Sequence, residues 1–347
     1  MLYFIYSACA FILASILLPL VIKLTTKHHV FDRNISINAT RVPRLGGIGV
    51  FFSFIIPLIV MITIGAEYHS YIGLIPLGLL FLLGLYDDLF NINAFLKLFF
   101  QVIIAILTVG YGEIVMIPTL FESSYWNTLI CNLLSVVIVV YVINAFNLID
   151  GIDGLASMLG ILAVFFIAIS LFIYQDSFYA AFSFIFCGSL MAFLRFNFSP
   201  ARIYLGDSGS MMIGYIAVML AFRLLELDRE IAGNVLNNKV YVLSLFIVPL
   251  YDTFRVFVIR IITLKSPFKR DENHIHHRLR LLGWSDTQIC LTLTSYTLLM
   301  VLLTFAFQGL SEVLQIFFLF LTAMLSNRLL AYKLQHDIST VRINRNI

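Results

Sequence analysis

The sequence has little charge, and this shortage excludes most soluble folds. Charged residues make up 12% of its 347 residues, about half of the usual share in a soluble domain, whereas 61% are hydrophobic. This composition predicts an integral membrane protein. The chain also lacks a long run of Lys and Arg, which gives nucleic-acid binding little support.

Cysteine is scarce as well, and the sequence lacks any Cys-x-x-Cys pair. The cysteines stand singly in apolar runs, at positions 9, 131, 187 and 290. This pattern argues against a disulfide framework or a thiolate metal site, and we expect buried small apolar residues. The first apolar run has no Lys or Arg before it, but Lys23 and Lys27 follow it. A cleaved signal peptide carries its charge on the other flank, so we expect a retained span.

Apolar stretches, in contrast, are abundant. A transmembrane helix needs about 20 mostly apolar residues. Candidate stretches lie near 2–22, 47–65, 70–86, 94–111, 128–146, 155–174, 178–195, 209–226, 240–262, 286–308 and 310–331. The predicted fold class is an all-α polytopic membrane protein with about 11 transmembrane helices. Residues 1–347 are expected to form a single integral membrane domain with a C-terminal tail at about 333–347.

The positive charges predict the orientation of these helices. Connecting segments that follow an odd number of spans share one side of the membrane, and they carry nearly all the Lys and Arg of the connections. The opposite segments carry only Arg229 and Lys239. Cytoplasmic loops are the ones enriched in Lys and Arg. We therefore expect the N-terminus outside, and the C-terminus and the odd-numbered segments in the cytoplasm.

Five polar clusters fall on this predicted cytoplasmic side. They are Arg41–Gly47, Asp87–Asp88, Asn144–Gly154, Tyr204–Ser210 and His274–His277. Taken alone, the third cluster fits a capped interhelical turn as well as it fits a ligand site. The alignment of five clusters on one face favours a ligand site, and predicts an active site at the cytoplasmic surface.

The carboxylates of these clusters suggest a divalent cation. If the side chains of Asp87, Asp88, Asp150, Asp153 and Asp207 were drawn together without a cation, they would raise one another's pKa. Oxygen ligands without thiolates favour Mg²⁺, or alternatively Mn²⁺, over zinc. Asp87 and Asp88 are neighbours, so on a helix their side chains point about 100° apart. We expect one at the reaction centre and the other in a structural role.

Other residues in these clusters suggest phosphate chemistry. Gly206 and Gly209 flank Asp207 and would let a phosphate approach the backbone closely. Donors for phosphate oxygens are available from His274, His276, His277, Arg278 and Arg280. Phosphoryl transfer needs a metal ion, a cationic clamp and a base or positioning group. For the histidines taken alone, a solvated basic loop is the alternative.

Three charged residues stand within the apolar stretches, where charge is costly. Asp252 and Arg255 lie three residues apart and are expected to pair. Lys97 lies one turn into its stretch and has no obvious partner nearby in the sequence. We therefore expect it to meet an anionic lipid head group.

The motifs resemble, in order and spacing, those of the polyprenyl-phosphate N-acetylhexosamine-1-phosphate transferases, the family of MraY, WecA and TagO. They are Pro-Arg-Leu-Gly-Gly at 43–47, Asp-Asp at 87–88, Asn-x-x-Asn-x-x-Asp-Gly-x-Asp-Gly at 144–154, Gly-Asp-x-Gly-Ser at 206–210 and His-x-His-His at 274–277. Each motif is weak alone, but their ordered occurrence is specific. The Arg-Leu-Gly-Gly and His-Ile-His-His-Arg-Leu variants look like the WecA/TagO branch.

This resemblance implies that an N-acetylhexosamine-1-phosphate moves from a UDP-sugar to undecaprenyl phosphate. GlcNAc-1-phosphate is the favoured group, and the hexosamine stays open because members of this branch differ in the sugar they take. The reaction would release UMP, use Mg²⁺ and begin lipid-linked glycan assembly for a cell-envelope polysaccharide such as O-antigen or teichoic acid. The expected setting is the bacterial inner membrane, and a homodimer is left open.

By resemblance, Asp207 looks like the principal Mg²⁺ ligand, with Asp88 as a further ligand, and Asp87 looks like the base. The catalytic set implied is Asp87, Asp88, Asp150, Asp153 and His276. Implied substrate-binding residues are Arg44, Lys97, Asn144, Asn147, Tyr204 as a uracil-stacking aromatic, His274, His277 and Arg278. Direct attack by the lipid phosphate and a two-step route through an aspartyl intermediate both stay open.

Two other functions compete with this interpretation. A secondary transporter would also have many spans with charges inside them, but its polar sites lie near the midplane, often in repeats, and no repeat is visible here. Gly206–Ser210 also resembles the nucleophile string of a serine hydrolase, which works only beside a suitable His and Asp. Neither alternative uses the full set of clusters.

Overall fold

The computed structural model describes residues 2–27, 42–65, 73–111, 125–230, 238–264 and 273–344. Every regular element longer than a turn in these ranges is helical. The chain divides into two compact units, Met1–Ala232 and Gly233–Ile347. Arg41, in the first predicted polar cluster, lies outside the described residues.

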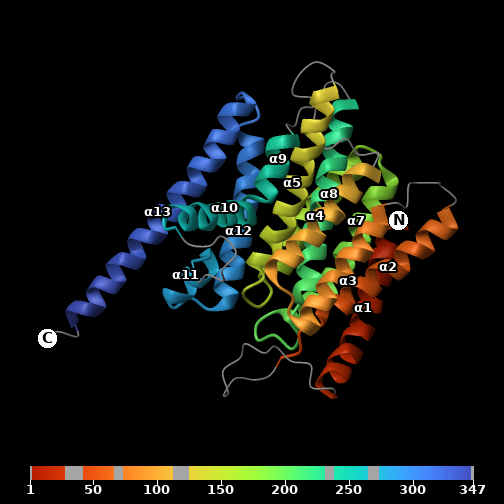
Figure 1. Cartoon of the computed structure of the whole chain (residues 1–347), viewed down its shortest axis with the longest axis horizontal. Helices are drawn as coiled ribbons and strands as arrows, with labels where there is room; N and C mark the ends of the chain where they lie inside the picture. Colours follow the sequence, from red (N-terminus) through yellow and green to blue (C-terminus); the bar gives the residue numbers. More distant parts are fainter. Residues whose placement is uncertain are drawn as a thin grey trace. The chain divides into compact units, whose positions relative to one another are not determined.

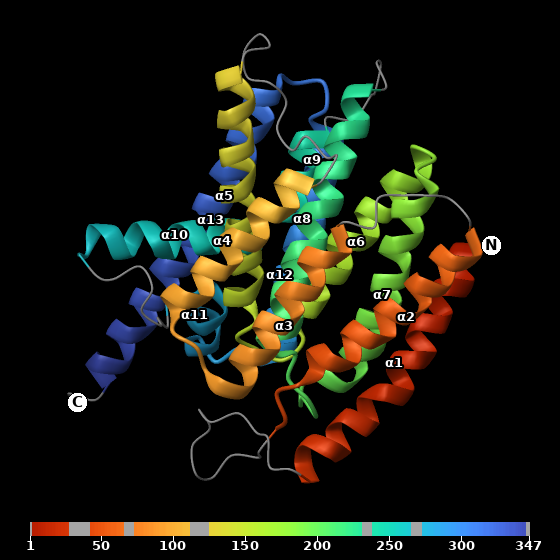
Figure 2. The ribbon, with the colours of Figure 1, turned by 45° about the vertical axis from the view of Figure 1, so that its right-hand side comes forward.

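The first unit contains eight helices, and the last of them is the central one. In order they are α1 (Leu2–Lys27), α2 (Gly46–Gly65), α3 (Leu74–Phe90), α4 (Ala94–Tyr111), α5 (Tyr125–Ile149), α6 (Leu155–Ile173), α7 (Ser177–Asn197) and α8 (Gly206–Glu230). Helix α8 packs against α2, α3, α5 and α6 (Figure 1), and the view of Figure 2 also shows α3 beside it. Its residues from Met211 to Phe222 are nearly all buried. The core of this unit therefore surrounds α8.

The second unit contains α9 (Asn238–Leu245), α10 (Ile247–Ile262), α11 (Ile275–Leu281), α12 (Asp286–Ala306) and α13 (Glu312–Asn344). Helices α9 and α10 meet at an angle of 71°, so the stretch predicted as a span over 240–262 is not one continuous helix. Pro249 lies in the first turn of α10, where its ring is tolerated. In one continuous helix, the ring would clash with the carbonyl of Leu245.

The helices confirm a polytopic membrane protein. Each of the predicted apolar stretches is helical over most of its described residues, and eight described helices are long and apolar enough to cross a membrane, or nine if α9 and α10 count as one span. Helix α4 is a shorter apolar helix. The prediction of about 11 spans, the orientation and the single-domain assignment stay predictions. Cys131, Cys187 and Cys290 are buried as expected, but Cys9 is exposed on the peripheral helix α1.

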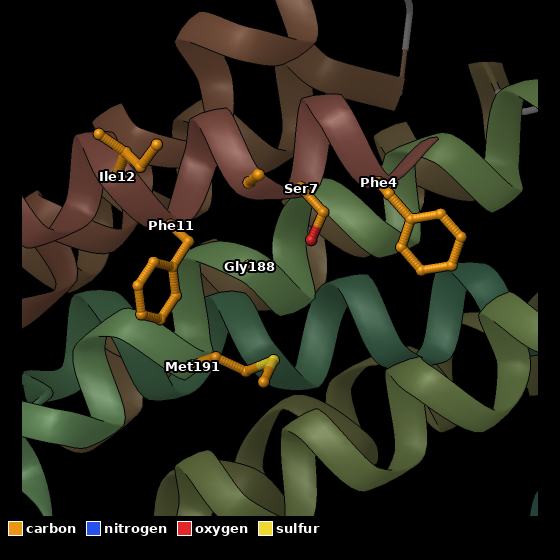
Figure 3. Close-up of a pocket in the computed structure, with 7 residues that line it drawn as sticks. Phe4, Ser7, Phe11, Ile12, Gly188 and Met191 are labelled. Carbon is orange, nitrogen blue, oxygen red and sulfur yellow. The ribbon is translucent and has the colours of Figure 1, made fainter. Parts of the chain in front are cut away.

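An apolar pocket of about 430 Å³ lies between α1 and α7. Figure 3 shows Phe4, Phe11 and Ile12 of α1 around it, facing Met191 of α7. Among its lining residues, Ser7 carries a hydroxyl, and no charged side chain is present. None of the predicted site residues lines this pocket, so the polar site lies elsewhere in the unit.

Candidate active site

Five helix ends of the first unit bring predicted site residues into contact. Asp87 and Asp88 lie in the last turn of α3, Lys97 in the first turn of α4, and Asn147 near the end of α5. The remaining contributors are Asp207 in the first turn of α8 and Arg44 just before α2. The structure thus brings the clusters of the first unit together, and the membrane side on which they lie stays a prediction. We call these six residues the carboxylate cluster.

Lys97 is the centre of the carboxylate cluster. Its Nζ lies 2.5 Å from Oδ2 of Asp207 and 2.9 Å from Oδ2 of Asp87, and it donates to Oδ1 of Asn147 at 3.3 Å. Its three protons thus have three acceptors. These partners of Lys97 could not be predicted from its neighbours in the sequence, because both carboxylates come from other helices.

Arg44 supplies a second positive charge. Its Nη2 donates to Oδ1 of Asp207 at 3.1 Å, and its Nε lies 3.4 Å from Oδ1 of Asp88. Three carboxylates therefore face two cations inside the protein. The sequence argument that these carboxylates require a metal ion for neutralisation is weakened, because Lys97 and Arg44 neutralise most of their charge.

Asp88 caps helix α8. Its Oδ1 accepts from the backbone N–H of Asp207 at 2.7 Å, and its Oδ2 accepts from the N–H and the hydroxyl of Ser208 at 3.0 and 2.7 Å. Unpaired N–H groups and the helix dipole make the start of a helix favourable for a carboxylate. The expected structural role in the Asp87–Asp88 pair thus belongs to Asp88. Its assignment as a metal ligand stays a prediction.

The same contacts contradict the hydrolase alternative. The Ser208 side chain is fully buried, and its hydroxyl donates to Asp88. No hydrogen bond found for the described residues joins Ser208 to a histidine. A serine nucleophile would need a histidine base at its hydroxyl.

Close backbone packing explains two glycines near the site. A Cβ on Gly84 would lie 2.4 Å from the Cα of Ser208, so α3 touches the backbone of α8. Gly206 has φ of +77°, and a Cβ there would lie 2.4 Å from the carbonyl oxygen of Arg44 and 2.6 Å from Asp88 Oδ2. The space beside Gly206 therefore serves packing within the protein, and the phosphate approach predicted there is not supported.

The structure adds Gln101, a buried polar residue outside the predicted clusters, and shows the partners of Asn144 and Asn147. Asn147 Nδ2 donates to Oδ1 of Asp207 at 3.0 Å and to Ser210 Oγ at 2.8 Å. Asn144, one turn away, donates instead to Oε1 of the fully buried Gln101 at 2.8 Å. Gln101 follows Lys97 by four residues on α4, so the two side chains lie on the same face of the helix. This spacing was the sequence signal that could have placed Gln101 beside the site.

Asp150 and Asp153 lie beside the carboxylate cluster, between α5 and α6. Burial, and then the charge of Asp207, raises the pKa of Asp150 to about 8. Asp153 Oδ2 accepts from the backbone N–H of Ala201 at 2.9 Å and so fixes the loop before α8. Tyr204 in the same loop exchanges backbone hydrogen bonds with Pro43 and Gly46. Its side chain as a uracil platform stays a prediction.

The cluster offers a small oxygen donor set to a cation. No group of three or more His, Cys, Asp or Glu in the described ranges is arranged to hold a metal ion. Mg²⁺, however, usually takes only one or two protein carboxylates and keeps water and phosphate oxygens as its other ligands. Asp87, Asp207 and the Asn147 carbonyl already converge on one cation, the Lys97 ammonium. The residues therefore fit Mg²⁺ if the ammonium moves aside.

The histidine cluster, His274, His276 and His277, lies in the second unit around Asp252. Asp252 is 2% exposed, accepts from the backbone N–H of Ile275 at 3.0 Å, and lies 2.8 Å from Nδ1 of His274. The predicted pair with Arg255 is confirmed at 2.7 Å. Asp252 thus joins α10 to the start of α11.

The buried ring nitrogens of this cluster are incompletely satisfied. The rings of His274 and His276 are nearly parallel, with centroids 5.9 Å apart. In the described part of the chain, Nε2 of His274 and both ring nitrogens of His276 have no hydrogen-bond partner. Burial, and then His277, lowers the pKa of His276 to about 3, so its ring is neutral at physiological pH. Arg278 donates to Asn327, a partner that the sequence did not suggest.

Comparison with known proteins identifies the family. Residues 70–225 match the model of glycosyl transferase family 4. The chain is similar to this family over these residues. The family match spans Asp87, Lys97, Asn147 and Asp207, whereas Arg44 and the histidine cluster lie outside it. The family predicted from the ordered motifs is confirmed.

Named relatives support the same family. The chain is 27% identical over 279 residues to a probable undecaprenyl-phosphate N-acetylglucosaminyl 1-phosphate transferase of Bacillus subtilis, covering 78% of this chain and 75% of that protein. It is 34% identical over 232 residues to an undecaprenyl-phosphate alpha-N-acetylglucosaminyl 1-phosphate transferase of Haemophilus influenzae, covering 65% and 64%. A phospho-N-acetylmuramoyl-pentapeptide-transferase of Oceanobacillus iheyensis is 28% identical, covering 73% and 79%.

Proposed function

We propose that this protein transfers N-acetylglucosamine-1-phosphate from UDP-GlcNAc to undecaprenyl phosphate and releases UMP. The observation that carries the proposal is the convergence of Asp87, Lys97, Asn147 and Asp207 from four helix ends of a polytopic membrane protein. At helix ends, a lipid-anchored phosphate and a water-soluble nucleotide sugar can reach the same side chains. Relatives named for the undecaprenyl-phosphate reaction support it.

The reaction is an in-line displacement at phosphorus. An oxygen of the lipid phosphate attacks the β-phosphorus of the UDP-sugar, and a new phosphorus–oxygen bond forms. The bond from that phosphorus to the oxygen bridging the α-phosphate breaks, so UMP leaves with this oxygen. Asp87 orients the acceptor phosphate and takes its proton when it carries one. Arg44 and Lys97 offset the negative charge of the phosphate oxygens.

The proposal includes Mg²⁺, held first by Asp207. Asp87 is a better second candidate than Asp88, because both oxygens of Asp88 are engaged at the start of α8. A bound Mg²⁺ would neutralise phosphate oxygens and orient the leaving group. The unpaired ring nitrogens of His274 and His276 are proposed to form hydrogen bonds with polar groups of a ligand.

The biological setting is part of the same proposal. A product linked to undecaprenyl diphosphate begins lipid-linked glycan assembly for a cell-envelope polysaccharide. The protein would then lie in the bacterial inner membrane with the carboxylate cluster on the cytoplasmic side, where UDP-sugars are available. The positive-inside distribution of Lys and Arg supports this orientation, and a homodimer would not alter the chemistry.

A detergent assay tests the proposal. Purified protein is mixed with undecaprenyl phosphate and either UDP-GlcNAc or UDP-GalNAc, with Mg²⁺ or with EDTA, and lipid-linked product and UMP are both measured. We expect equal amounts of the two products with UDP-GlcNAc and neither product in EDTA. Glu312→Gln, which alters an exposed pair with Lys239, serves as the active control. Failure of every UDP-hexosamine would exclude the function, and full activity in EDTA would exclude the metal.

A further inference from the structure

Two carboxylates in the carboxylate cluster are each held at one oxygen by the rest of the fold. Asp207 Oδ1 accepts from Arg44 and Asn147, and Asp87 Oδ1 accepts from the backbone N–H of Ile92 at 2.8 Å. The other oxygen of each carboxylate, Oδ2, faces the Lys97 ammonium at 2.5 or 2.9 Å. The scaffold thus fixes the orientation of both carboxylates without Lys97. Both Oδ2 atoms are directed to one point.

The position between these two oxygens can hold one cation at a time. Mg²⁺ binds carboxylate oxygens at about 2.0–2.1 Å, so an ion on Asp207 Oδ2 would overlap or strongly repel an ammonium at 2.5 Å. Lysine carries its charge on a flexible four-carbon stem, and Lys97 stands in the first turn of α4 near the helix end. Its ammonium can leave this position without a movement of α4.

We propose that Lys97 is an exchangeable counter-ion. In the metal-free protein its single positive charge is shared by Asp87 and Asp207, and a divalent cation that binds Asp207 Oδ2 displaces it. The displaced ammonium is then available to an anionic phosphate beside the metal. The exchange itself concerns only the metal and the protein. The use of the freed ammonium for phosphate rests on the proposed function.

Competition between the two cations can be measured without turnover. Metal-free protein in detergent is titrated with Mn²⁺, and free Mn²⁺ is followed by electron paramagnetic resonance. Lys97→Met removes the competing charge at similar side-chain length, so we expect Mn²⁺ to bind at least about tenfold more tightly than to the unaltered protein. Lys239→Met removes a charge from the exposed pair with Glu312 and is expected to leave the affinity unchanged.

A second substitution locates the ion. Asp207→Asn in the Lys97→Met background is expected to abolish the tight Mn²⁺ site. Equal or weaker Mn²⁺ binding by Lys97→Met would overturn the proposal. A site that survives Asp207→Asn, or the absence of saturable binding in both the unaltered protein and Lys97→Met, would overturn it as well.

Amine labelling tests the exchange in the unaltered protein, in case Lys97→Met does not fold. The protein is treated briefly with an acetylating reagent, with and without Mg²⁺, and the acetylation of each lysine is quantified by mass spectrometry. We expect Mg²⁺ to increase acetylation of Lys97 severalfold and to leave Lys239 unchanged. An unchanged or decreased rate at Lys97 would contradict displacement. If Mn²⁺ competes with Lys97 but no lipid-linked product forms, only the proposed function is refuted. If the protein transfers the sugar phosphate but Mn²⁺ does not compete with Lys97, only the exchange is refuted.

Discussion

The carboxylate cluster of the first unit and the histidine cluster of the second unit are both largely buried, but they differ in how their polar atoms are satisfied. Around Asp207, the carboxylate oxygens accept from Lys97, Arg44 and Asn147. Around Asp252, the carboxylate is satisfied, yet three ring nitrogens of His274 and His276 have no partner in the described ranges.

This difference predicts two ways of binding a ligand. The carboxylate cluster already contains its own cations, so a metal ion has to displace Lys97 or Arg44, and a phosphate has to compete with the carboxylates for these two side chains. The histidine cluster leaves buried nitrogens unpaired, which costs free energy in the absence of a ligand. A ligand that pairs with them replaces no protein contact. Each prediction below tests one side of this comparison.

Loss of a carboxylate from the first cluster should have the largest effect. Asp87→Asn keeps the shape of the side chain but removes the base and a partner of Lys97, so we expect turnover to fall roughly 10²- to 10⁴-fold. The rate of UMP release at saturating substrates is the measurement. Glu312→Gln is the matched control. Full activity in Asp87→Asn would remove this residue from the mechanism.

Asp252→Asn should have a smaller effect through His274. The amide can still accept a hydrogen bond, but it can also present its NH₂ group to Nδ1, so the orientation and tautomer of the ring are no longer fixed. Carboxylates that orient ligating histidines in metal sites typically contribute 10- to 100-fold, and we expect a loss of activity in that range. The kcat and KM for the UDP-sugar are measured together with the unfolding temperature. A loss of thermal stability with normal kinetics would show that Asp252 only joins α10 to α11.

Gly84→Ala should disturb the carboxylate cluster through packing. A Cβ at Gly84 would lie 2.4 Å from the backbone of Ser208, and overpacking of this kind typically costs about 1–3 kcal/mol. The unfolding temperature in detergent and the turnover are both expected to fall. Gly78→Ala on the same helix is the control, because a Cβ there meets nothing within 4 Å. Equal stability of the two variants would contradict close contact between α3 and α8.

The pH dependence of stability gives the smallest expected effect. Burial raises the pKa of Asp150 to about 8, above its unfolded value of about 3.9, so the folded protein holds a proton that the unfolded chain releases. Its contribution is fully present below the unfolded pKa and is lost as pH rises toward 8. We expect the metal-free protein to lose a few degrees of unfolding temperature between pH 6 and 8.

Asp150→Asn is the control for this effect, since its side chain does not titrate. We expect the unfolding temperature of this variant to fall less between pH 6 and pH 8 than that of the unaltered protein. The pKa of His276 is lowered to about 3, so its contribution makes the protein more stable as pH rises. This contribution changes only below the unfolded pKa of His276, about 6.5. Identical slopes in the variant and the unaltered protein would show that Asp150 is already ionised near neutral pH.

Local sequence patterns predicted much of the helical content correctly. Apolar stretches of span length became helices, because a backbone in hydrocarbon has to satisfy its own hydrogen bonds. The exception was the stretch over 240–262, where Pro249 coincides with a bend of 71°. An isolated proline does not determine a bend in a membrane helix, because neighbouring helices can satisfy the freed backbone groups. The bend therefore depends on the packing of α9 and α10.

The sequence by itself determined the membrane class, the family and the types of residue in the site. These follow from composition and from the ordered motifs. Only the tertiary structure decided how those residues divide their roles. Asp87 and Asp88 are identical in type and adjacent in sequence, yet one faces Lys97 and the other caps α8. Their partners come from helices distant in the sequence, so no local pattern could distinguish them.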